Sequence, residues 1–463
     1  MSRRPLWQEI FERFDPVKPV EDPAWRANRP LSPFEDINRS LDRPFGIPHL
    51  LLTGTMGTGK TTELLRIAEA RVSKEFVVFL DLVRHFEQVV GDAVALQHVS
   101  PWEVCFLAGI ALIRSAEERL GFTFPPAHVE ELRQAWLKLA RSSGEVPEEP
   151  AIDIAKLAKS MLLLASTAAP TVVAGPAGAA VSLGLGTLNA TADAAKWSLP
   201  IGLKKKALPD QDAQVQTLLQ CVNVLIGLVQ QRSGKVLLII DGLDRIASSE
   251  RAKELFVDSQ MIGQLACRLV LCGPFGLRHD AAIANVQAFS DVRPLVNVPV
   301  LSQQDPSQPG RGVSFFRELF ERRVANLGAA DLIPPDLLDK LAYYSGGRAR
   351  DFVLSIRQLA GLAWDADVVS ATAELVDKVL DDRRRFRETG MNRSKIRLLE
   401  SVVADPDHRL PEGEDVNILL TIGALLPYPD GSEWYYPHPL LMMKLIQRRP
   451  AGSRSDWGSL FGR

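Results

Sequence analysis

The sequence predicts an α/β fold in which a parallel sheet is followed by a helical lid and a C-terminal winged-helix-like module. Short apolar runs that end in glycine or aspartate alternate with helical segments, as in a parallel sheet covered on both faces. Beyond Leu301 the pattern becomes helical, with helices interrupted by proline and glycine. Near the C-terminus, Asp430-Gly431 between two short segments predicts a hairpin turn.

Five segments are expected to form the strands of this sheet. Each contains a short run of mainly apolar residues, which is typical of a strand buried on both faces. In chain order they lie within residues 48–54, 75–82, 235–245, 267–273 and 294–301.

The segment after the first strand, GTMGTGKT from Gly54 to Thr61, matches the phosphate-loop pattern G-x-x-x-x-G-K-T. Its glycines let backbone N–H groups face phosphates closely, and the start of the following helix adds partial positive charge. We expect the Lys60 ammonium to reach the β- and γ-phosphates of ATP and the Thr61 hydroxyl to ligate Mg²⁺. The expected nucleotide-binding residues are Gly54, Gly57, Thr58, Gly59, Lys60, Thr61 and Thr62.

A second motif, VLLIIDGLDR, places Asp241 at the end of the third apolar strand. A carboxylate at this position can hold the magnesium shell opposite Thr61. We therefore expect Asp241 and Thr61 to be the protein ligands of the metal ion. Many P-loop ATPases have glutamate directly after this aspartate, whereas this chain has Gly242.

The catalytic base must then be another acidic residue. Asp244 is the nearest one, and Asp81 at the end of the second strand is an alternative. A structural ion pair, with Arg245 for example, would explain Asp244 equally well. If no group polarises the attacking water well, hydrolysis should be slow, which suits a switch better than a motor.

An arginine on the lid is the remaining catalytic candidate. In SGGRARDFV, a Gly-Gly bend precedes a helix that carries Arg348 and Arg350. We expect Arg350 to stabilise the γ-phosphate and so to report which nucleotide is bound. Arg278, after the fourth strand, is a similar candidate, and solvated surface arginines are the alternative for both. The expected catalytic residues are Lys60, Asp241, Asp244 and Arg350.

At these residues the chain resembles the STAND and AAA+ groups of P-loop ATPases, which belong to the ASCE class. The resemblance lies in GTMGTGKT, LLIIDGLDR, VNVPVLS, SGGRAR and the C-terminal YYPHPLL. The spelling DGLDR also resembles the Asp-x-x-Asp-Arg motif of KAP ATPases, which carry membrane segments between their two nucleotide motifs. The resemblance implies an ATPase with ATP and Mg²⁺ as cofactors.

The motifs also divide the chain into domains. An N-terminal arm precedes the ATPase domain and is expected to pack on the segment next to it, and the ATPase domain contains an apolar insert at about 155–205. The boundaries are 1–47 for the arm, 48–300 for the P-loop ATPase domain, 301–385 for the helical lid, 391–448 for the winged-helix-like module and 449–463 for a tail.

The insert contains an uncharged run, residues 160–192, that is long enough to enter a bilayer. Pro170 and Pro176 interrupt it, and it is rich in glycine and alanine. A single membrane span is excluded, because nucleotide motifs lie on both sides of the run and must share one compartment. Two alternatives remain: a re-entrant or interfacial hairpin at a membrane, or a small-residue helical hairpin buried against the protein or a second subunit.

Composition limits the partners and the location. The chain has 463 residues and a formal net charge of −2, so no global attraction to nucleic acid is expected. The basic segment 381–393 is interpreted as a solvated helix that links the lid to the C-terminal module. Of the four cysteines, Cys105, Cys267 and Cys272 lie in apolar runs, as expected of buried thiols in a cytosolic protein.

We therefore expect a cytoplasmic protein, peripheral at the inner face of the membrane if the apolar run reaches lipid. Its partners should be further copies of the chain or another protein, and nucleic acid is not expected.

Three functions fit these observations. The first is a slowly hydrolysing, nucleotide-dependent switch, with roles in defence or signalling as the resemblance implies. The second is an AAA+-like DNA-associated ATPase, which the order of lid and winged-helix-like module favours. The third is a scaffold that binds ATP without hydrolysing it, since no glutamate stands directly after Asp241.

Overall fold

The computed structural model divides the chain into two compact units. What we call the lid unit comprises Met1–Ser32, Thr55–Thr62 and Leu295–Arg463, and the sheet unit comprises Pro33–Gly54 and Glu63–Pro294. The structure describes residues 2–17, 20, 22–142, 153–161, 163–166, 185–188, 212–279, 283, 286, 288–413, 415–430 and 432–446.

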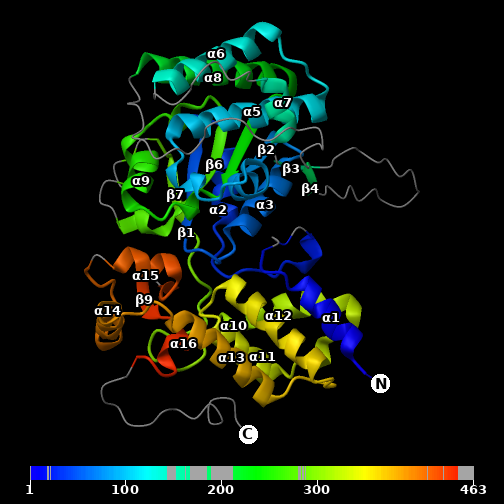
Figure 1. Cartoon of the computed structure of the whole chain (residues 1–463), viewed down its shortest axis with the longest axis vertical. Helices are drawn as coiled ribbons and strands as arrows, with labels where there is room; N and C mark the ends of the chain where they lie inside the picture. Colours follow the sequence, from blue (N-terminus) through cyan, green and yellow to red (C-terminus); the bar gives the residue numbers. More distant parts are fainter. Residues whose placement is uncertain are drawn as a thin grey trace. The chain divides into compact units, whose positions relative to one another are not determined.

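The sheet unit is built on seven strands in the order β4-β3-β2-β5-β6-β1-β7 (Figure 1). The five strands from β2 to β7 in this order are parallel, which confirms the predicted parallel sheet. They are β1 (His49–Gly54), β2 (Phe76–Asp81), β5 (Val236–Asp241), β6 (Arg268–Pro274) and β7 (Asp291–Pro294). All residues of β1, β2 and β5 are buried, as expected for strands covered on both faces.

The fifth predicted strand is displaced toward the N-terminus. The sequence placed it at 294–301, whereas β7 ends at Pro294. Proline has no backbone N–H for a ladder, and two prolines, Pro294 and Pro299, lie in the predicted segment. The chain from Leu295 onward belongs to the lid unit, where Val298 and Val300 are buried.

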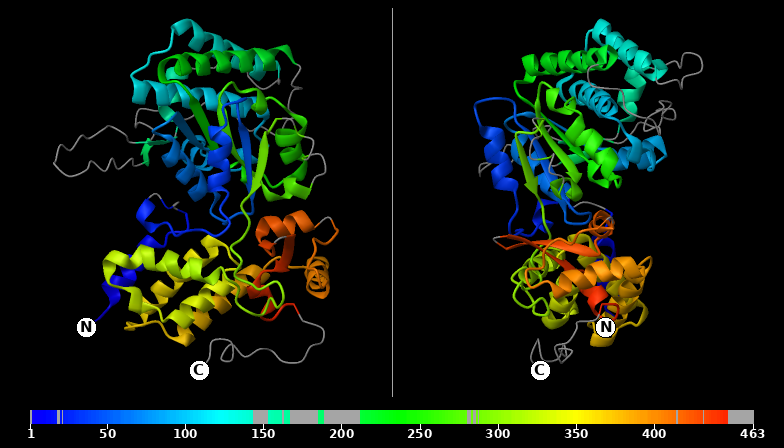
Figure 2. Two further views of the ribbon diagram at one scale, coloured as in Figure 1. Left: turned by 180° about the vertical axis from the view of Figure 1, so that it is seen from behind. Right: turned by 90° about the vertical axis from the view of Figure 1, so that its left-hand side faces the viewer.

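Helices cover the sheet within its unit. The long helix α5 begins with a capping box, in which the Glu103 carboxylate accepts hydrogen bonds from the backbone N–H and the hydroxyl of Ser100. Helices α5, α6 and α8 pack on one another and form a helical layer (Figure 2). The helices of this unit include α2 (Phe34–Asp42), α4 (Leu82–His85), α5 (Pro101–Leu120), α6 (Pro126–Ser142), α7 (Ile154–Ser160), α8 (Ala213–Ser233) and α9 (Ser249–Lys253). Helix α3 (Lys60–Arg71) follows β1 and the intervening loop.

Among the helices that the structure describes, α8 is the one whose length and composition would suit a membrane span. Its apolar residues have a local explanation, because a stripe of them at helical spacing is buried against α5 and α6. The stripe consists of Val215, Leu218, Leu219, Val222, Leu225, Ile226 and Val229.

Two short segments within the apolar run are strands. β3 (Leu163–Ser166) pairs antiparallel with β4 (Leu185–Leu188) and with β2. The expected helical hairpin is therefore wrong for these eight residues, whose backbone instead extends the hydrogen bonding beyond the outer edge of β2. Residues 162, 167–184 and 189–192 of the run lie outside the described residues, so membrane contact stays a prediction.

A buried charge cluster joins elements of the sheet unit. The Glu75 carboxylate, just before β2, accepts a hydrogen bond of 2.8 Å from Arg268 of β6 and another from Arg71 of α3. Arg71 also pairs with Asp42 at 2.5 Å. The side chains of Glu75 and Arg71 are 1% and 2% exposed, so this pair is shielded from solvent, whereas Asp42 is half exposed.

The lid unit is mainly helical, as predicted. Helix α12 begins directly after the Gly346-Gly347 bend, where both glycines have positive φ. Adding a Cβ to Gly347 would place it 2.0 Å from the Val298 carbonyl oxygen, so only glycine fits there. Its main helices are α1 (Arg4–Arg13), α10 (Val313–Val324), α11 (Pro335–Tyr344), α12 (Ala349–Asp365), α13 (Ala373–Glu388), α14 (Arg393–Ala404), α15 (Val416–Ile422) and α16 (Pro439–Met442).

The N-terminal arm contributes to the core of the lid unit. Helix α1 packs against α12, although the two are far apart in the sequence (Figure 1). Trp7, Ile10 and Phe14 are fully buried there, and the Trp7 indole donates a hydrogen bond of 3.0 Å to the Val368 carbonyl. The sequence suggested packing on the adjacent segment of the chain, whereas the first helix of the arm packs on the distant lid.

A two-stranded hairpin lies near the C-terminus. β8 (Leu425–Asp430) pairs antiparallel with β9 (Ser432–Pro437), which confirms the predicted hairpin, although Gly431 lies outside the described residues. Tyr428 and Trp434 stack across the strands with ring centroids 4.8 Å apart. We call residues 393–446, from α14 to the segment after α16, the C-terminal module.

Candidate nucleotide-binding site

The phosphate loop connects strand β1 to helix α3, which is the context that the motif requires. Gly57 and Gly59 have φ values of +85° and +104°, backbone conformations that residues with a side chain rarely adopt. The Thr58 hydroxyl donates a hydrogen bond of 2.9 Å to the Thr55 carbonyl, and the Lys60 ammonium donates one of 2.8 Å to the same oxygen. Both side chains are buried, and the Lys60 side chain is held against the backbone of its own loop by this hydrogen bond.

Three successive carbonyls of this loop accept hydrogen bonds from the arm and the lid. The donors are arginine side chains in two cases and a backbone N–H in the third. The Arg348 guanidinium donates to Met56 O at 3.0 Å through Nε and again through Nη2, Arg350 N donates to Gly57 O at 3.1 Å, and Arg29 Nη1 donates to Thr58 O at 2.5 Å.

These contacts determine the direction of the loop's amide hydrogens. In a trans peptide the C=O and the following N–H point in opposite directions, and no cis peptide is present among the described residues. Each of the N–H groups of Gly57, Thr58 and Gly59 therefore points away from the donor that holds the carbonyl of its own peptide, and the Thr58 N–H donates to the Thr55 carbonyl at 3.5 Å. Successive N–H groups on one side of a loop form the concave arrangement that binds anions such as phosphate.

The structure places the two predicted lid arginines differently. Arg350 reaches the loop through its backbone N–H, and a Cβ on Gly57 would lie 3.1 Å from Arg350 Cβ. Arg348, which the sequence indicated only as a neighbour of Arg350, is buried and makes the side-chain contact. Burial lowers the pKa of Arg348 to about 10, so it remains cationic at neutral pH.

Arg29 is a loop contact that sequence analysis missed. Its guanidinium holds the Thr58 carbonyl and, at 2.5 Å, the Val296 carbonyl. An arginine in an arm rich in arginine and proline carries no motif, so no local signal marks it. The other predicted arginine, Arg278, lies in a short 3-10 helix after β6, with its guanidinium 5.7 Å from the centre of the Phe275 ring.

Asp241 ends strand β5, as predicted, and Gly54 ends β1 in the same parallel sheet. The carboxyl ends of parallel strands share one edge, where ligands of α/β proteins bind. Asp241 is buried, and its carboxylate accepts a hydrogen bond of 2.8 Å from the backbone N–H of Gly242. Aspartate oxygen is a ligand type that suits Mg²⁺.

Gly242 shows why no glutamate stands directly after Asp241 in this chain. Its φ is +100°, and a Cβ would lie 2.8 Å from Val83 Cγ2 and 3.0 Å from the Val83 backbone nitrogen. A side chain at this position would therefore be both strained and obstructed. The departure from the common pattern is a property of the local backbone.

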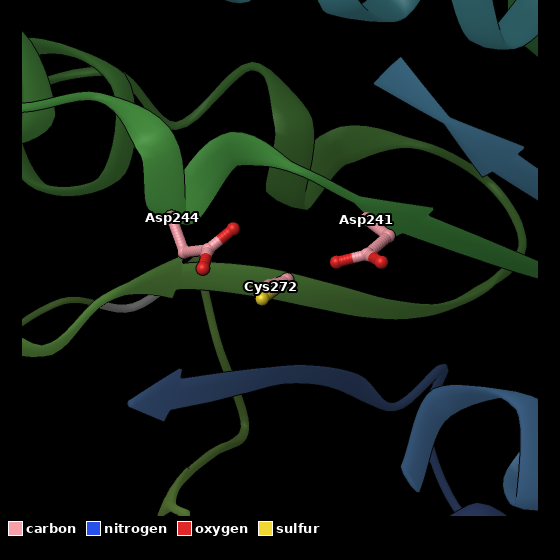
Figure 3. Close-up of side chains that lie close together, drawn as sticks. All are labelled: Asp241, Asp244 and Cys272. Atoms are coloured by element: carbon pink, nitrogen blue, oxygen red, sulfur yellow. The ribbon is translucent and has the colours of Figure 1, made fainter. Parts of the chain in front are cut away.

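Asp244 lies beside Asp241 with Cys272 of β6. One ligand atom of each residue lies within 4.8 Å of the other two. Figure 3 shows Asp241 at the end of β5, Asp244 in the turn after it, and Cys272 between them on the neighbouring strand. The two carboxylates suit a hard cation such as Mg²⁺, whereas the thiol suits softer metals. The sequence indicated the two aspartates but gave Cys272 only a buried position.

Asp81, the alternative base, has a structural contact of its own. Its carboxylate accepts a hydrogen bond of 3.1 Å from Arg84 N and so caps helix α4. Burial raises the pKa of Asp81 above its ordinary value. Asp81 ends β2 directly beside Asp241 in the strand register, so the second and third predicted strands bring two carboxylates to one edge.

Comparisons with known proteins give no match by sequence: no protein-family model and no curated protein matches the chain. Similar solved structures include the Walker-type ATPase paby2304 of Pyrococcus abyssi, with 11% identity, a TM-score of 0.41 and coverage of 93% of this chain and 98% of that one. The ADP form of the Aeropyrum pernix ORC2 protein has 12% identity, a TM-score of 0.38 and coverage of 93% and 94%. Drosophila ORC bound to DNA has 12% identity, a TM-score of 0.35 and coverage of 86% and 72%.

Likenesses at these scores carry no argument about function. The fold is assigned from the chain itself: a strand, a glycine-containing phosphate loop and a helix follow one another, and this strand is one of the five parallel strands of the sheet that also presents Asp241. The chain has an α/β fold of the P-loop nucleotide-binding type.

Proposed function

We propose that the chain is an AAA+-type P-loop ATPase that works as a nucleotide-dependent switch, with ATP and Mg²⁺ as cofactors. The observation that carries the proposal is the contact between the loop and the lid: Arg348 and Arg350 hold two successive carbonyls of the phosphate loop. Any phosphate that engages the loop's N–H groups acts on peptides that the lid also holds. Nucleotide binding is thereby linked to lid conformation.

The residues have separate roles in this proposal. Lys60 exchanges the Thr55 carbonyl for phosphate oxygens, which places a positive charge on the β- and γ-phosphates. Thr61 and Asp241 would hold Mg²⁺, which would supply positive charge against the charge that develops on the phosphates. Asp244 orients the attacking water. Because Gly242 excludes a glutamate, this orientation is weak and turnover is slow.

Phosphate release tests hydrolysis and separates the switch from the non-hydrolysing scaffold. We expect the purified protein to release phosphate from ATP slowly but above background, and Asp241→Asn to abolish this release. Asp244→Asn should lower the rate without preventing ATP binding. If the wild type binds ATP but its phosphate release stays at background, the switch is excluded and the non-hydrolysing scaffold remains.

A DNA-associated ATPase is the second candidate, because α14 and α15 precede a β hairpin in the order that a winged helix requires. The basic segment 381–393 gives little support to this DNA-associated function. Four of its five arginines pair with carboxylates: Arg383 with Asp351, Arg384 with Asp381 and Glu388, Arg385 with Asp381, and Arg387 with Asp351. A gel shift with duplex DNA at two salt concentrations tests this candidate. Binding that weakens steeply with salt would support it, because contacts to DNA phosphates give a steep salt dependence.

Assembly and location belong to the same proposal. A switch needs a surface that changes with nucleotide, and we propose further copies of the chain or a partner protein as its target, in the cytoplasm. Contact with the inner face of a membrane through residues 160–192 is proposed on the sequence alone. Liposome flotation with and without ATP·Mg²⁺ tests it, and a protein that never floats would rule it out.

A further inference from the structure

A buried carboxylate in the lid unit is surrounded by arginines. The Asp351 side chain is 8% exposed and lies 3.0 Å from Arg348 Nη1, 2.6 Å from Arg383 Nη2 and 2.5 Å from Arg387 Nη2. Burial alone would raise the pKa of Asp351, but the charges of Arg387 and Arg348 overcome it and hold the pKa well below its usual range. His438 Nε2 lies 3.8 Å away, and burial lowers its pKa to about 3, so it is neutral at pH 7.

One of these arginines connects the carboxylate to the phosphate loop. Arg348 donates to the Met56 carbonyl through Nε and Nη2, while its Nη1 faces Asp351. All three guanidinium nitrogens are therefore engaged, which fixes the plane of the group. Since the Met56 carbonyl sets the direction of the Gly57 N–H, Asp351 acts on the loop through Arg348.

A second arginine connects the same carboxylate to the C-terminal module. Arg387 Nη1 donates to the carbonyls of Gly423 at 3.1 Å and Ile422 at 3.3 Å, where helix α15 ends. Free carbonyls at a helix C-terminus favour such a cation. Gly423 also meets Arg348, because a Cβ at this position would lie 2.1 Å from Arg348 Nη1.

Asn297 provides a parallel route. It is 1% exposed, and its amide donates a hydrogen bond of 3.1 Å to the Pro427 carbonyl in β8. Its side-chain oxygen accepts one of 3.5 Å from the hydroxyl of Thr55, at the start of the loop. The loop is thus joined to both the α15 end and the hairpin by buried polar contacts.

We infer that Arg348, oriented by Asp351, is a positioning residue that couples phosphate binding at the loop to the C-terminal module. The inference deepens the proposed function and rests on it. Phosphate binding fixes the Met56–Gly57 peptide, which fixes the guanidinium of Arg348 and with it the end of α15. Linkage makes the effect reciprocal: a partner that moves α15 changes nucleotide affinity by the same factor.

The test compares Arg348→Met and Arg348→Lys with Arg357→Met. Arg357 is a matched control: it lies on α12 and pairs with Asp15 at 3.6 Å, without a contact to the loop among the described interactions. Affinities for ATP·Mg²⁺ and ADP are measured by calorimetry, and hydrogen exchange is followed at the amides from Gly423 to Leu426. We expect Arg348→Met to weaken the affinity for both nucleotides by about tenfold or more. The control Arg357→Met should weaken these affinities by less than about twofold.

In the wild type, ATP should slow exchange at these four amides, and Arg348→Lys at saturating ATP should lose that response. Wild-type exchange that ATP leaves unchanged, or Arg348→Met affinity equal to wild type, would overturn the inference while the proposed function stands. A wild type that binds no ATP would refute the proposed function itself. The wild-type exchange result decides even if both Arg348 variants fail to fold.

Discussion

Each unit buries a carboxylate among arginines, but the two clusters connect different things. In the sheet unit, Glu75 joins Arg71 and Arg268, which belong to a helix and a strand of the same core. In the lid unit, Asp351 joins arginines that themselves hold the phosphate loop and the end of α15. The same chemistry therefore stabilises the core of the sheet unit, whereas in the lid unit we propose that it couples the phosphate loop to the C-terminal module.

The comparison separates stability from function. A buried carboxylate with two or three arginines is costly to break wherever it lies, because the remaining charges stay buried. Only the Asp351 cluster also touches the nucleotide loop. Variants of either cluster should be less stable, but only variants of the Asp351 cluster should also bind nucleotide more weakly.

The largest effect is expected from Asp351→Asn. It leaves Arg348, which is buried, and Arg383 and Arg387, which are mostly buried, without their shared carboxylate, and it should lower the free energy of unfolding by about 3–5 kcal/mol. Because Arg348 loses its orientation, the folded fraction should also bind ATP more weakly. Urea unfolding and calorimetry check the two effects, and a stability loss with unchanged affinity would show that this cluster is structural only.

Glu75→Gln should cost about 3 kcal/mol, since an amide keeps the shape but removes the carboxylate that pairs with Arg268 and leaves Arg71 with Asp42 alone. Urea unfolding measures the loss. Nucleotide affinity under native conditions should match the wild type, because the cluster has no described contact to the loop. Weaker ATP binding in this variant would remove the distinction between the two clusters.

Gly242→Glu, which restores the common pattern, should destabilise the protein by about 2 kcal/mol through its positive φ and its contact with Val83. We expect no gain in hydrolysis, because the carboxylate cannot be accommodated without moving the backbone. Gly242→Ala is the control for strain alone. Faster phosphate release by Gly242→Glu would contradict this explanation of slow turnover.

Both units should also show a pH dependence of stability, whose slope per pH unit is smaller than the effects of the substitutions above. Burial lowers the pKa of His85 in the sheet unit and of His438 in the lid unit to about 3 each. Between pH 6.5 and 3 the unfolded chain binds the extra protons, so the free energy of unfolding falls as pH falls, by up to about 1.4 kcal/mol per pH unit for each histidine. The stabilising effect of the lowered Asp351 pKa is lost only as pH falls below about 4.

Unfolding at pH 7, 6 and 5 therefore isolates the histidines from Asp351. His85→Asn and His438→Asn should each remove part of the slope. A slope that neither substitution reduces would show that other groups are responsible.

The sequence predicts features that are encoded in contiguous residues. Gly54 to Thr61 and Asp241 were located because a loop, a strand end and their glycines are local patterns. The strand after β6 was misplaced because an apolar run with prolines resembles a strand, whereas Pro294 ends it and the residues after it pack in the lid unit. The ends of the apolar run form β3 and β4 because they pair at the edge of β2, which no local pattern reveals.

The contacts that hold the loop could not be predicted in the same way. Arg29 and Arg348 lie 29 and 292 residues from the loop carbonyls that they hold. Asp351 is only three residues from Arg348, but it lies 32 and 36 residues from Arg383 and Arg387, and no local pattern brings these three arginines to it. Cys272 likewise joins the two aspartates only through the neighbouring strand. Sequence patterns indicated the chemistry of the site, while its support depends on tertiary contacts.

The central claim is that this loop binds nucleotide, and a titration of ATP·Mg²⁺ into the wild type and Lys60→Ala tests it most directly. We predict saturable binding at one site in the wild type and none in Lys60→Ala. Thermal unfolding without nucleotide, measured for both proteins, confirms that the variant is folded. Equal affinity in the two proteins would contradict the account.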